Sequence, residues 1–97
     1  MNEFILNAII SKGEITQKLN QVKGRHFVYI LLDGNMVIYV GRSRNLHDRL
    51  HYHKHTKAFD SVNLYEYDNY NTCCIAEKEL VKHYKPMLNK LWVKYGA

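Results

Sequence analysis

The chain has 97 residues, a length that predicts one small domain with a thin hydrophobic core. Its 14 Lys and Arg residues against 9 Asp and Glu residues give a net charge of +5, which suits a phosphate-rich partner but is weak support for one by itself. The sequence shows no signal peptide and no membrane-spanning stretch, and its two cysteines, Cys73 and Cys74, are too close in sequence to bridge readily. We therefore expect a cytoplasmic, intracellular protein with reduced thiols.

Residues 1–24 are predicted to form an N-terminal helical extension. Apolar side chains at positions 5 and 9, and at positions 15, 19 and 22, follow helical spacing. The Ser11-Lys12-Gly13 sequence divides this segment into two short helices. We expect the extension to pack against a sheet, and an added DNA contact or a dimer face is the alternative.

Residues 27–32 and 36–40 are predicted to form the two strands of a hairpin. Both runs are rich in β-branched and aromatic residues, and Asp33-Gly34-Asn35 between them is a strong turn signal. If the strands pair around this turn, Tyr29 and Tyr39 are near cross-strand neighbours. Two tyrosines on one strand face usually indicate packing, so other residues must decide whether they have a chemical role.

A helix is predicted over residues 46–55, with Asn45 as its N-cap and with Leu46, Leu50 and His53 facing inward. Arg49 and His53 are four residues apart and therefore share one face of this helix. The planar guanidinium of arginine binds phosphate oxygens through two parallel hydrogen bonds. Arg49 is thus a candidate phosphate ligand, and a solvated ion-pair partner is the alternative.

The same helix carries histidines that raise the question of a zinc site. His47 and His51 have the i, i+4 spacing of a zinc-binding pair. No glutamate directly follows His47, and the sequence indicates no third ligand. A solvated helix face is the preferred interpretation, and an intracellular zinc protein is a weaker alternative.

A third strand is predicted over residues 61–68 and a second helix over residues 73–85, which Pro86 ends. Glu77 falls within the apolar stripe of this helix. A carboxylate on a core face is costly unless it is paired or holds a cation. Glu77 is therefore a candidate metal ligand, and an ion pair with Arg49 is the alternative.

Together these residues resemble the GIY-YIG nuclease family. The family signature has two tripeptides on a hairpin, here Phe27-Val28-Tyr29 and Tyr39-Val40-Gly41, followed by a helix arginine, here Arg49. The similarity covers a family core over residues 26–89, with a closing segment over 90–97, and it departs from the signature where Phe27 replaces a glycine. It implies an α+β fold with a small three-stranded antiparallel sheet flanked by helices.

The resemblance also implies a metal-dependent DNA endonuclease that hydrolyses phosphodiester bonds with one divalent cation, Mg²⁺ or Mn²⁺. Glu77 would bind the metal, Arg49 would bind the scissile phosphate, and Tyr29, either alone or together with His53, would act as general base. Tyr39 would form a hydrogen bond within the site, and Asn89 would orient a site group or contact the backbone. The basic residues expected to line the path of the DNA are Arg42, Arg44, Lys54 and Lys57.

A catalytically silent nucleic-acid-binding or scaffold protein that keeps the fold is the alternative to an enzyme. The enzyme is favoured by the joint presence of Tyr29, Tyr39, Arg49, Glu77 and Asn89, because a degenerate relative would most readily lose the glutamate or the arginine. No separate DNA-targeting domain is visible in the sequence. We therefore expect weak sequence specificity, a homodimer or a partner protein.

Overall fold

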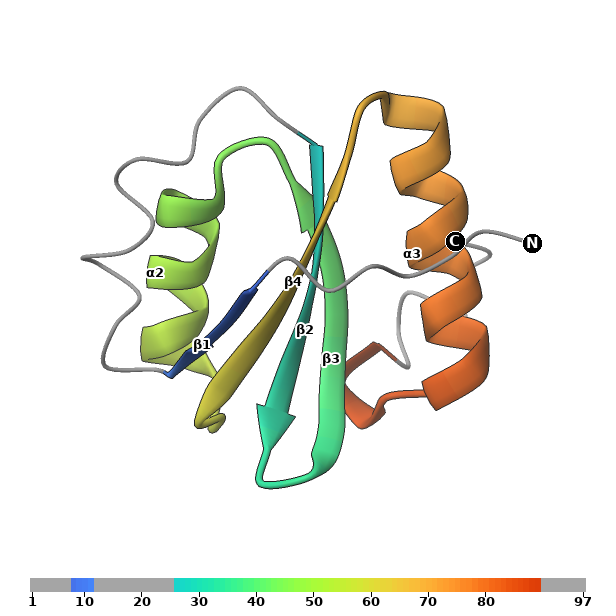
Figure 1. Ribbon diagram of the computed structural model, residues 1–97. Coiled ribbons are helices and arrows are strands. Elements are labelled where there is room, and N and C mark those ends of the chain that lie inside the picture. Colours follow the sequence, from blue (N-terminus) through green and yellow to red (C-terminus); the bar gives the residue numbers. More distant parts are fainter. Residues whose placement is uncertain (1–7, 12–25, 90–97) are drawn as a thin grey trace.

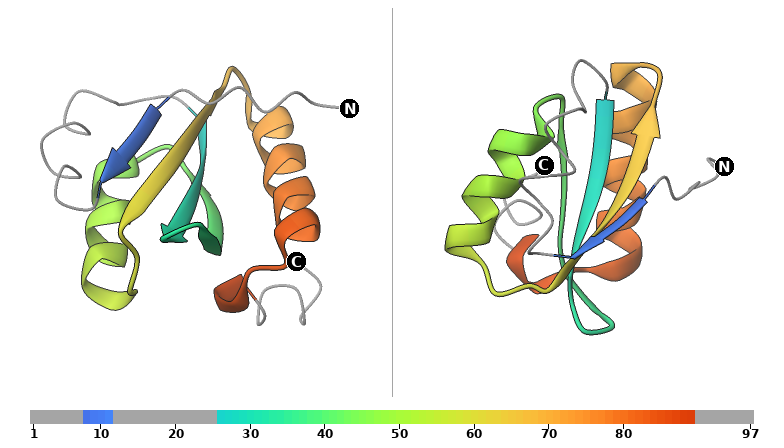
Figure 2. Two further views of the ribbon diagram at one scale, coloured as in Figure 1. Left: turned by 60° about the horizontal axis from the view of Figure 1, so that its bottom comes forward. Right: turned by 60° about the vertical axis from the view of Figure 1, so that its left-hand side comes forward.

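The computed structural model describes residues 8–11 and 26–89. In this part of the chain, antiparallel strands form one sheet in the order β1-β4-β2-β3. The strands are β1 (Ala8–Ser11), β2 (His26–Asp33), β3 (Met36–Ser43) and β4 (Ser61–Tyr67). Helix α2 (Leu46–Thr56) connects β3 to β4, and helix α3 (Tyr70–Tyr84) is followed by the short 3-10 helix η2 (Met87–Asn89). Figures 1 and 2 show α2 and α3 on opposite faces of the sheet.

The predicted hairpin, third strand and two main helices are confirmed, and the α+β fold class with them. The hairpin turn contains Gly34 with a φ of 61°, a left-handed conformation that glycine adopts without strain. The Gly34 N–H donates a 2.9 Å hydrogen bond to the Asp60 carboxylate, which ties the turn to the segment preceding β4.

The turn is one residue tighter than the sequence suggested, and a bulge compensates for it. Asp33 pairs directly with Met36, so the turn itself has two residues. Leu32 pairs with Val37 and Leu31 pairs with Tyr39, which leaves Ile38 as the extra residue of the bulge. Without this bulge, Tyr39 would face the opposite side of the sheet from Tyr29, because side chains alternate along a strand. The bulge therefore places both signature tyrosines on the α2 face.

The prediction of a helix within residues 1–24 was wrong for Ala8–Ser11, which form strand β1. This strand pairs with β4, from Ala8 opposite Leu64 to Ser11 opposite Ser61. Two consecutive β-branched residues, Ile9 and Ile10, suit a strand, and the edge of β4 offers unpaired backbone groups to it. The rest of the predicted extension and the closing segment over 90–97 lie outside the described residues.

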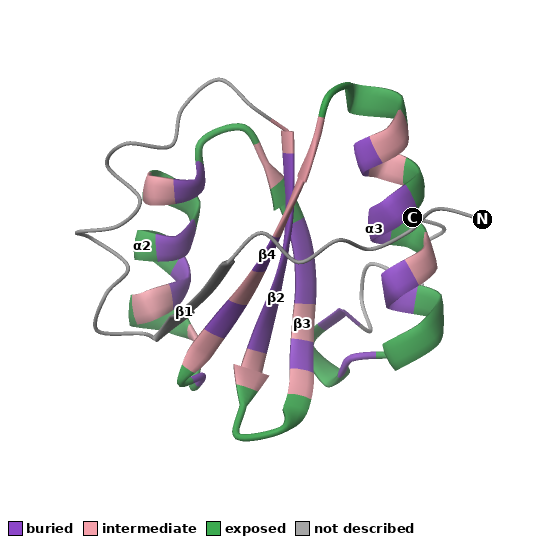
Figure 3. Cartoon of the chain, viewed as in Figure 1, coloured by how far each residue is buried: buried purple, intermediate pink, exposed green. Residues whose placement is uncertain are grey.

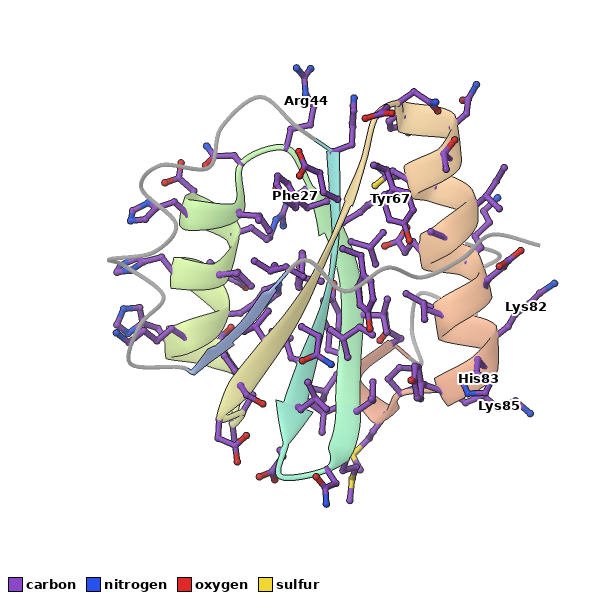
Figure 4. All side chains as sticks on the ribbon, viewed as in Figure 1. Phe27, Arg44, Tyr67, Lys82, His83 and Lys85 are labelled. Atoms are coloured by element: carbon purple, nitrogen blue, oxygen red, sulfur yellow. The ribbon has the colours of Figure 1, made fainter. Side chains whose placement is uncertain are left out.

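Each face of the sheet packs against one helix (Figure 3). Because side chains alternate along each strand, the core consists of two buried clusters, one on the α2 side and one on the α3 side. On the α2 side, Phe27 is only 4% exposed and belongs to the same buried cluster as Leu46 and Leu50. The residue that departs from the family signature is thus a core side chain, and Figure 4 shows it between the sheet and α2. On the α3 side, buried residues of β2 and β3 pack against the helix: Val28, Ile30, Val40, Cys73, Ala76, Leu80 and Val81.

Capping residues fix where the two helices begin and end. Asn45 caps α2, as predicted, and its side chain accepts a hydrogen bond from the Asp48 N–H. Asn69 caps α3 and accepts a 2.8 Å bond from the Thr72 N–H, so this helix begins at Tyr70 rather than at residue 73. Lys85, with a φ of 46°, ends α3 before Pro86. Within the residues described, no helix is both long and apolar enough to cross a membrane.

Candidate active site

Tyr29 occupies the centre of the candidate site, on β2, with its hydroxyl group over Gly41 of β3. The two residues are direct cross-strand partners, and Tyr29 is only 1% exposed. A Cβ atom at position 41 would overlap the Tyr29 hydroxyl oxygen and would lie 2.5 Å from the Cζ atom of the same ring. It would also lie 2.9 Å from Cε2 of Tyr39. The glycine of the second tripeptide is therefore required because it leaves space for the Tyr29 ring.

Tyr39 lies diagonally across the hairpin from Tyr29, and the centroids of the two rings are 6.1 Å apart. Burial raises the pKa of both hydroxyl groups. The negative charge of Glu77 raises both pKa values further, and the positive charge of Arg49 acts in the opposite direction. Both phenols are therefore protonated at neutral pH, and both are subject to charges from α2 and from α3.

His53 of α2 completes this aromatic cluster, facing inward as predicted. Its Nε2 atom is 2.7 Å from the Tyr29 hydroxyl oxygen, and its ring centroid is 5.0 Å from that of Tyr39. Burial lowers the pKa of His53 to about 4, and the positive charges of Lys57 and Arg49 contribute to the same direction. His53 is thus a neutral imidazole at neutral pH, so Nε2 is able to accept a hydrogen bond from Tyr29.

The neutral, buried state of His53 predicts a specific loss of stability in acid. A histidine in the unfolded chain has a pKa of about 6.5, so the unfolded chain takes up the proton first as the pH falls. The contribution of His53 to the free energy of unfolding should be greatest above about pH 6.5. It should decrease as the pH falls to about 4, the pKa of His53 in the folded protein, by about 3 kcal/mol in all. We expect urea unfolding of the wild type at pH 7, 5.5 and 4.5 to show this decline.

The control compares two histidines of the same helix. His53→Gln should lack this contribution to the pH dependence, whereas His51→Gln, at an exposed position, should keep it. An identical pH dependence in wild type and His53→Gln would contradict the assignment of His53 as a buried neutral base.

Glu77 is buried on the inner face of α3, as predicted, and pairs with Arg42 of β3. The Arg42 Nε atom donates a 3.0 Å hydrogen bond to Glu77 Oε1. Burial raises the pKa of Glu77, and the neighbouring Arg42 charge partly offsets this rise. This pairing differs from the sequence-based expectations, which are an ion pair between Glu77 and Arg49 and a place for Arg42 along the DNA. The structure pairs Glu77 with Arg42 because Arg42 follows Gly41 on β3 and therefore faces α3.

Arg49 lies on the exposed side of α2, where it lines an open cavity of about 270 Å³. The remaining lining residues come from the end of β3 and the first turns of α2: Ser43, Asn45, Asp48 and Tyr52. The positive charge of Arg49 partly offsets the rise that burial causes in the pKa values of Tyr29 and Tyr39. The same charge adds to the decrease that burial causes in the pKa of His53. The structure therefore brings Arg49 into electrostatic contact with the aromatic cluster.

Asn89 of η2 binds the backbone of β3. Its Nδ2 group donates to the Val40 carbonyl oxygen and its Oδ1 atom accepts from the Val40 N–H, both at 2.8 Å. Asn89 is 3% exposed, and β3 is the outermost strand on that side of the described sheet. The amide therefore satisfies backbone groups that an edge strand would otherwise leave unpaired. Of the two roles expected for Asn89, the structure has the backbone contact.

The four basic residues expected along the DNA are not equivalent. Arg42 faces Glu77, and its guanidinium carbon lies 5.0 Å from the centroid of the Tyr70 ring. Arg44 is exposed and extends from the end of β3, away from the rest of the molecule (Figure 4). The Lys57 Nζ atom lies 5.0 Å from the Tyr39 ring centroid, and Lys54 is half-buried on α2. Arg44 thus stands between two residues that line the cavity, Ser43 and Asn45. Lys57 lies beside Tyr52, which also lines it.

Glu77 remains the candidate ligand for a divalent cation, because it is a buried carboxylate with Arg42 as its ion-pair partner. Among the described residues no group of three or more His, Cys, Asp or Glu side chains is placed to hold a metal ion. This part of the chain therefore offers no multi-ligand zinc site, although His47 and His51 stack with centroids 6.0 Å apart. Mg²⁺ retains several waters and is commonly held by one or two carboxylates together with phosphate oxygens, so a single carboxylate suits it.

Tyr52 is a residue of the candidate site that was not expected from the sequence. It is 57% exposed and lines the cavity together with Arg49. Its position beside Arg49 could have been predicted from the spacing, since Tyr52 follows Arg49 by three residues and residues three apart are neighbours on a helix surface.

Known proteins are similar to this chain in structure but not detectably in sequence. No protein-family model matches the chain, and no curated protein sequence is significantly similar to it. The chain is similar to two crystal structures of the GIY-YIG N-terminal endonuclease domain of UvrC from Thermotoga maritima. One is a point mutant bound to its catalytic divalent cation, and the other is bound to magnesium. Each has 23% identity and a TM-score of 0.63, over 76% of this chain and 92% or 93% of the other. The chain therefore has a GIY-YIG-like fold, as the hairpin tripeptides and Arg49 suggested.

Proposed function

We propose that this protein is an intracellular, metal-dependent DNA endonuclease that hydrolyses phosphodiester bonds. The observation that carries this proposal is the convergence of groups from both faces of the sheet around β3. On the α2 face the buried Tyr29 and His53 form an aromatic cluster with the half-buried Tyr39, and the Glu77 charge acts on both tyrosines from the α3 face. Phosphoryl transfer needs an anchored phosphate, a proton acceptor and a group that stabilises developing negative charge, and these residues provide candidates for each.

Arg49 is the proposed ligand of the scissile phosphate. Its planar guanidinium offers paired N–H donors to phosphate oxygens. It is exposed at the open cavity, so a DNA strand has access to it, and its charge reaches the aromatic cluster. Arg49 would thus position the phosphate beside Tyr29 and neutralise charge that develops in the transition state.

Tyr29 and His53 form the proposed proton-accepting pair. The Tyr29 oxygen accepts a proton from the attacking water while its own hydroxyl proton moves to His53 Nε2 along their 2.7 Å contact. This exchange avoids a free phenolate, which burial makes unfavourable. A bound phosphate would offset the positive charges of Arg49 and Lys57 that lower the pKa of His53. Tyr39 packs against both rings and fixes their orientation.

Glu77 would hold Mg²⁺ or Mn²⁺, which when bound supplies positive charge at the phosphate and favours ionisation of a water molecule. Arg42 is a positioning residue, because its bond to Oε1 fixes the orientation of the Glu77 carboxylate. Asn89 is likewise a positioning residue, since it holds the strand segment between Tyr39 and Gly41. Arg44, Lys54 and Lys57 are proposed to contact DNA phosphates outside the reacting group, in agreement with the net charge of +5.

Cleavage of supercoiled plasmid and of a branched DNA tests this proposal. We expect nicking in Mg²⁺ or Mn²⁺ that EDTA abolishes. Arg49→Ala should reduce the rate by at least about 100-fold, the usual cost of losing one donor to developing charge. Lys82→Ala is the matched control, because Lys82 points outward from the far end of α3, and it should cleave normally (Figure 4).

A catalytically silent nucleic-acid-binding protein is the second candidate function. One observation favours it: the Arg42–Glu77 ion pair neutralises the buried carboxylate without a metal ion. A folded wild type that binds DNA but does not cleave it with either cation would favour this second function over the enzyme.

A further inference from the structure

The cavity beside Arg49 contains an aromatic surface that the proposed chemistry does not use. Tyr52 is 57% exposed, although it lies one helical turn from Arg49 and lines the same cavity. Its ring is held by neighbours rather than by a buried core: the Lys57 Nζ atom lies 5.6 Å from its centroid, and the His53 ring meets it edge to face at 5.6 Å. An exposed but oriented tyrosine next to a phosphate-binding arginine is an arrangement that single-stranded nucleic-acid sites use.

Three other residues that line the cavity are also held in place. The Asn45 N–H donates to Ser43 Oγ at 2.9 Å, and the Asn45 Nδ2 group donates to the Asp48 carboxylate at 2.8 Å. These bonds fix the polar wall without any contribution from a ligand. The cavity volume of about 270 Å³ is slightly below the range of about 300–1,000 Å³ for sites of drug-sized ligands, so it suits one flat ring system.

We propose that this cavity is a stacking subsite for one unpaired nucleobase of the strand whose phosphate binds Arg49. A base inside a duplex already stacks on both faces and cannot lie against a protein ring without leaving the helix. An unpaired or terminal base has an uncovered face, and stacking on tyrosine tolerates every base type. The proposal rests on the proposed function and narrows its substrate class to DNA with an unpaired nucleotide next to the scissile phosphate.

Binding measurements test the subsite without depending on cleavage. The probes are a gapped duplex with 2-aminopurine at an unpaired position, a single-stranded oligonucleotide and a fully paired duplex, each titrated without divalent cations. We expect Tyr52→Ala to weaken binding to the first two probes by about 10-fold and to the paired duplex by less than about 2-fold. Tyr52→Trp should restore the affinity, and quenching of 2-aminopurine fluorescence should depend on an aromatic residue at this position.

Tyr84→Ala is the matched control, because Tyr84 is also exposed (44%) but lies at the end of α3 on the other face of the sheet. It should leave all three affinities unchanged. Equal losses on paired and unpaired probes, or no loss in a Tyr52→Ala protein with an unchanged melting temperature, would overturn the subsite. Normal plasmid cleavage in that case would leave the proposed nuclease intact. A wild type that neither cleaves nor binds DNA would instead remove the proposed function and the subsite with it.

Discussion

Glu77→Gln should abolish metal-dependent cleavage and should leave the protein at least as stable as the wild type. A bound cation contributes several kcal/mol of charge stabilisation to phosphoryl transfer, and each 1.36 kcal/mol is a factor of ten in rate. We therefore expect the cleavage rate to fall by about 10³-fold or more. Glutamine keeps the shape of the side chain and an oxygen that can still accept the bond from Arg42 Nε, but it lacks the charge that binds a cation.

The stability prediction follows from the direction of the pKa shift. Burial raises the pKa of Glu77 despite the neighbouring Arg42, so the folded protein holds the ionised carboxylate less favourably than water does. A neutral amide removes this cost at neutral pH. Arg42 would lose its charged partner, but its side chain is 38% exposed and water can solvate it. The free energy of unfolding should therefore be equal or higher.

Two measurements decide the role of Glu77. Plasmid nicking with Mg²⁺ reports the rate, and titration with Mn²⁺ reports cation binding independently of cleavage. Glu79→Gln, two residues along the same helix, is the matched control and should change neither result. A Glu77→Gln protein that still cleaves at the wild-type rate would contradict the proposed metal site. A protein that loses cleavage because it is destabilised would show instead that the carboxylate is mainly structural.

The sequence predicted those parts of the site that depend on local patterns. The Asp-Gly-Asn turn located the hairpin, the Asn45 cap positioned the helix of Arg49, and the apolar stripe of the second helix showed that Glu77 is buried. In each case a periodicity of a few residues contains the necessary information. These patterns, together with the resemblance carried by the two tripeptides, were sufficient to predict the three-stranded core of the sheet and its two main helices.

Other features depend on contacts between distant segments. Strand β1 forms because β4, about fifty residues away along the chain, presents an open edge to it, and no local pattern contains that partner. The bulge at Ile38 decides which face Tyr39 occupies. The three-residue turn expected from the sequence would place Tyr39 on the same face without a bulge, so the correct face was predicted from a turn that is one residue too long. The pairing of Arg42 with Glu77 likewise depends on which helix covers which face of the sheet.

Gly41→Ala should damage stability and activity together, in contrast to Glu77→Gln. The added Cβ atom would overlap the Tyr29 hydroxyl oxygen and press on Tyr39, and Tyr29 is too deeply buried to move aside freely. Overpacking of this kind costs about 1–3 kcal/mol, or a decrease in melting temperature of roughly 4–8 °C for each kcal/mol. Displacing Tyr29 by about 1 Å relative to His53 would lower the cleavage rate by about 100-fold.

Two further variants separate this steric effect from a general effect of replacing glycine. Gly34→Asn is the control, because nothing lies near a Cβ atom at the turn and asparagine tolerates its φ of 61°. It should melt and cleave nearly as the wild type does. Adding Tyr29→Phe to Gly41→Ala removes the overlapping oxygen, so the double variant should be more stable than the sum of the two single losses predicts. Additive losses, or an unchanged melting temperature in Gly41→Ala, would show that the tyrosine hydroxyl does not require the space above this glycine.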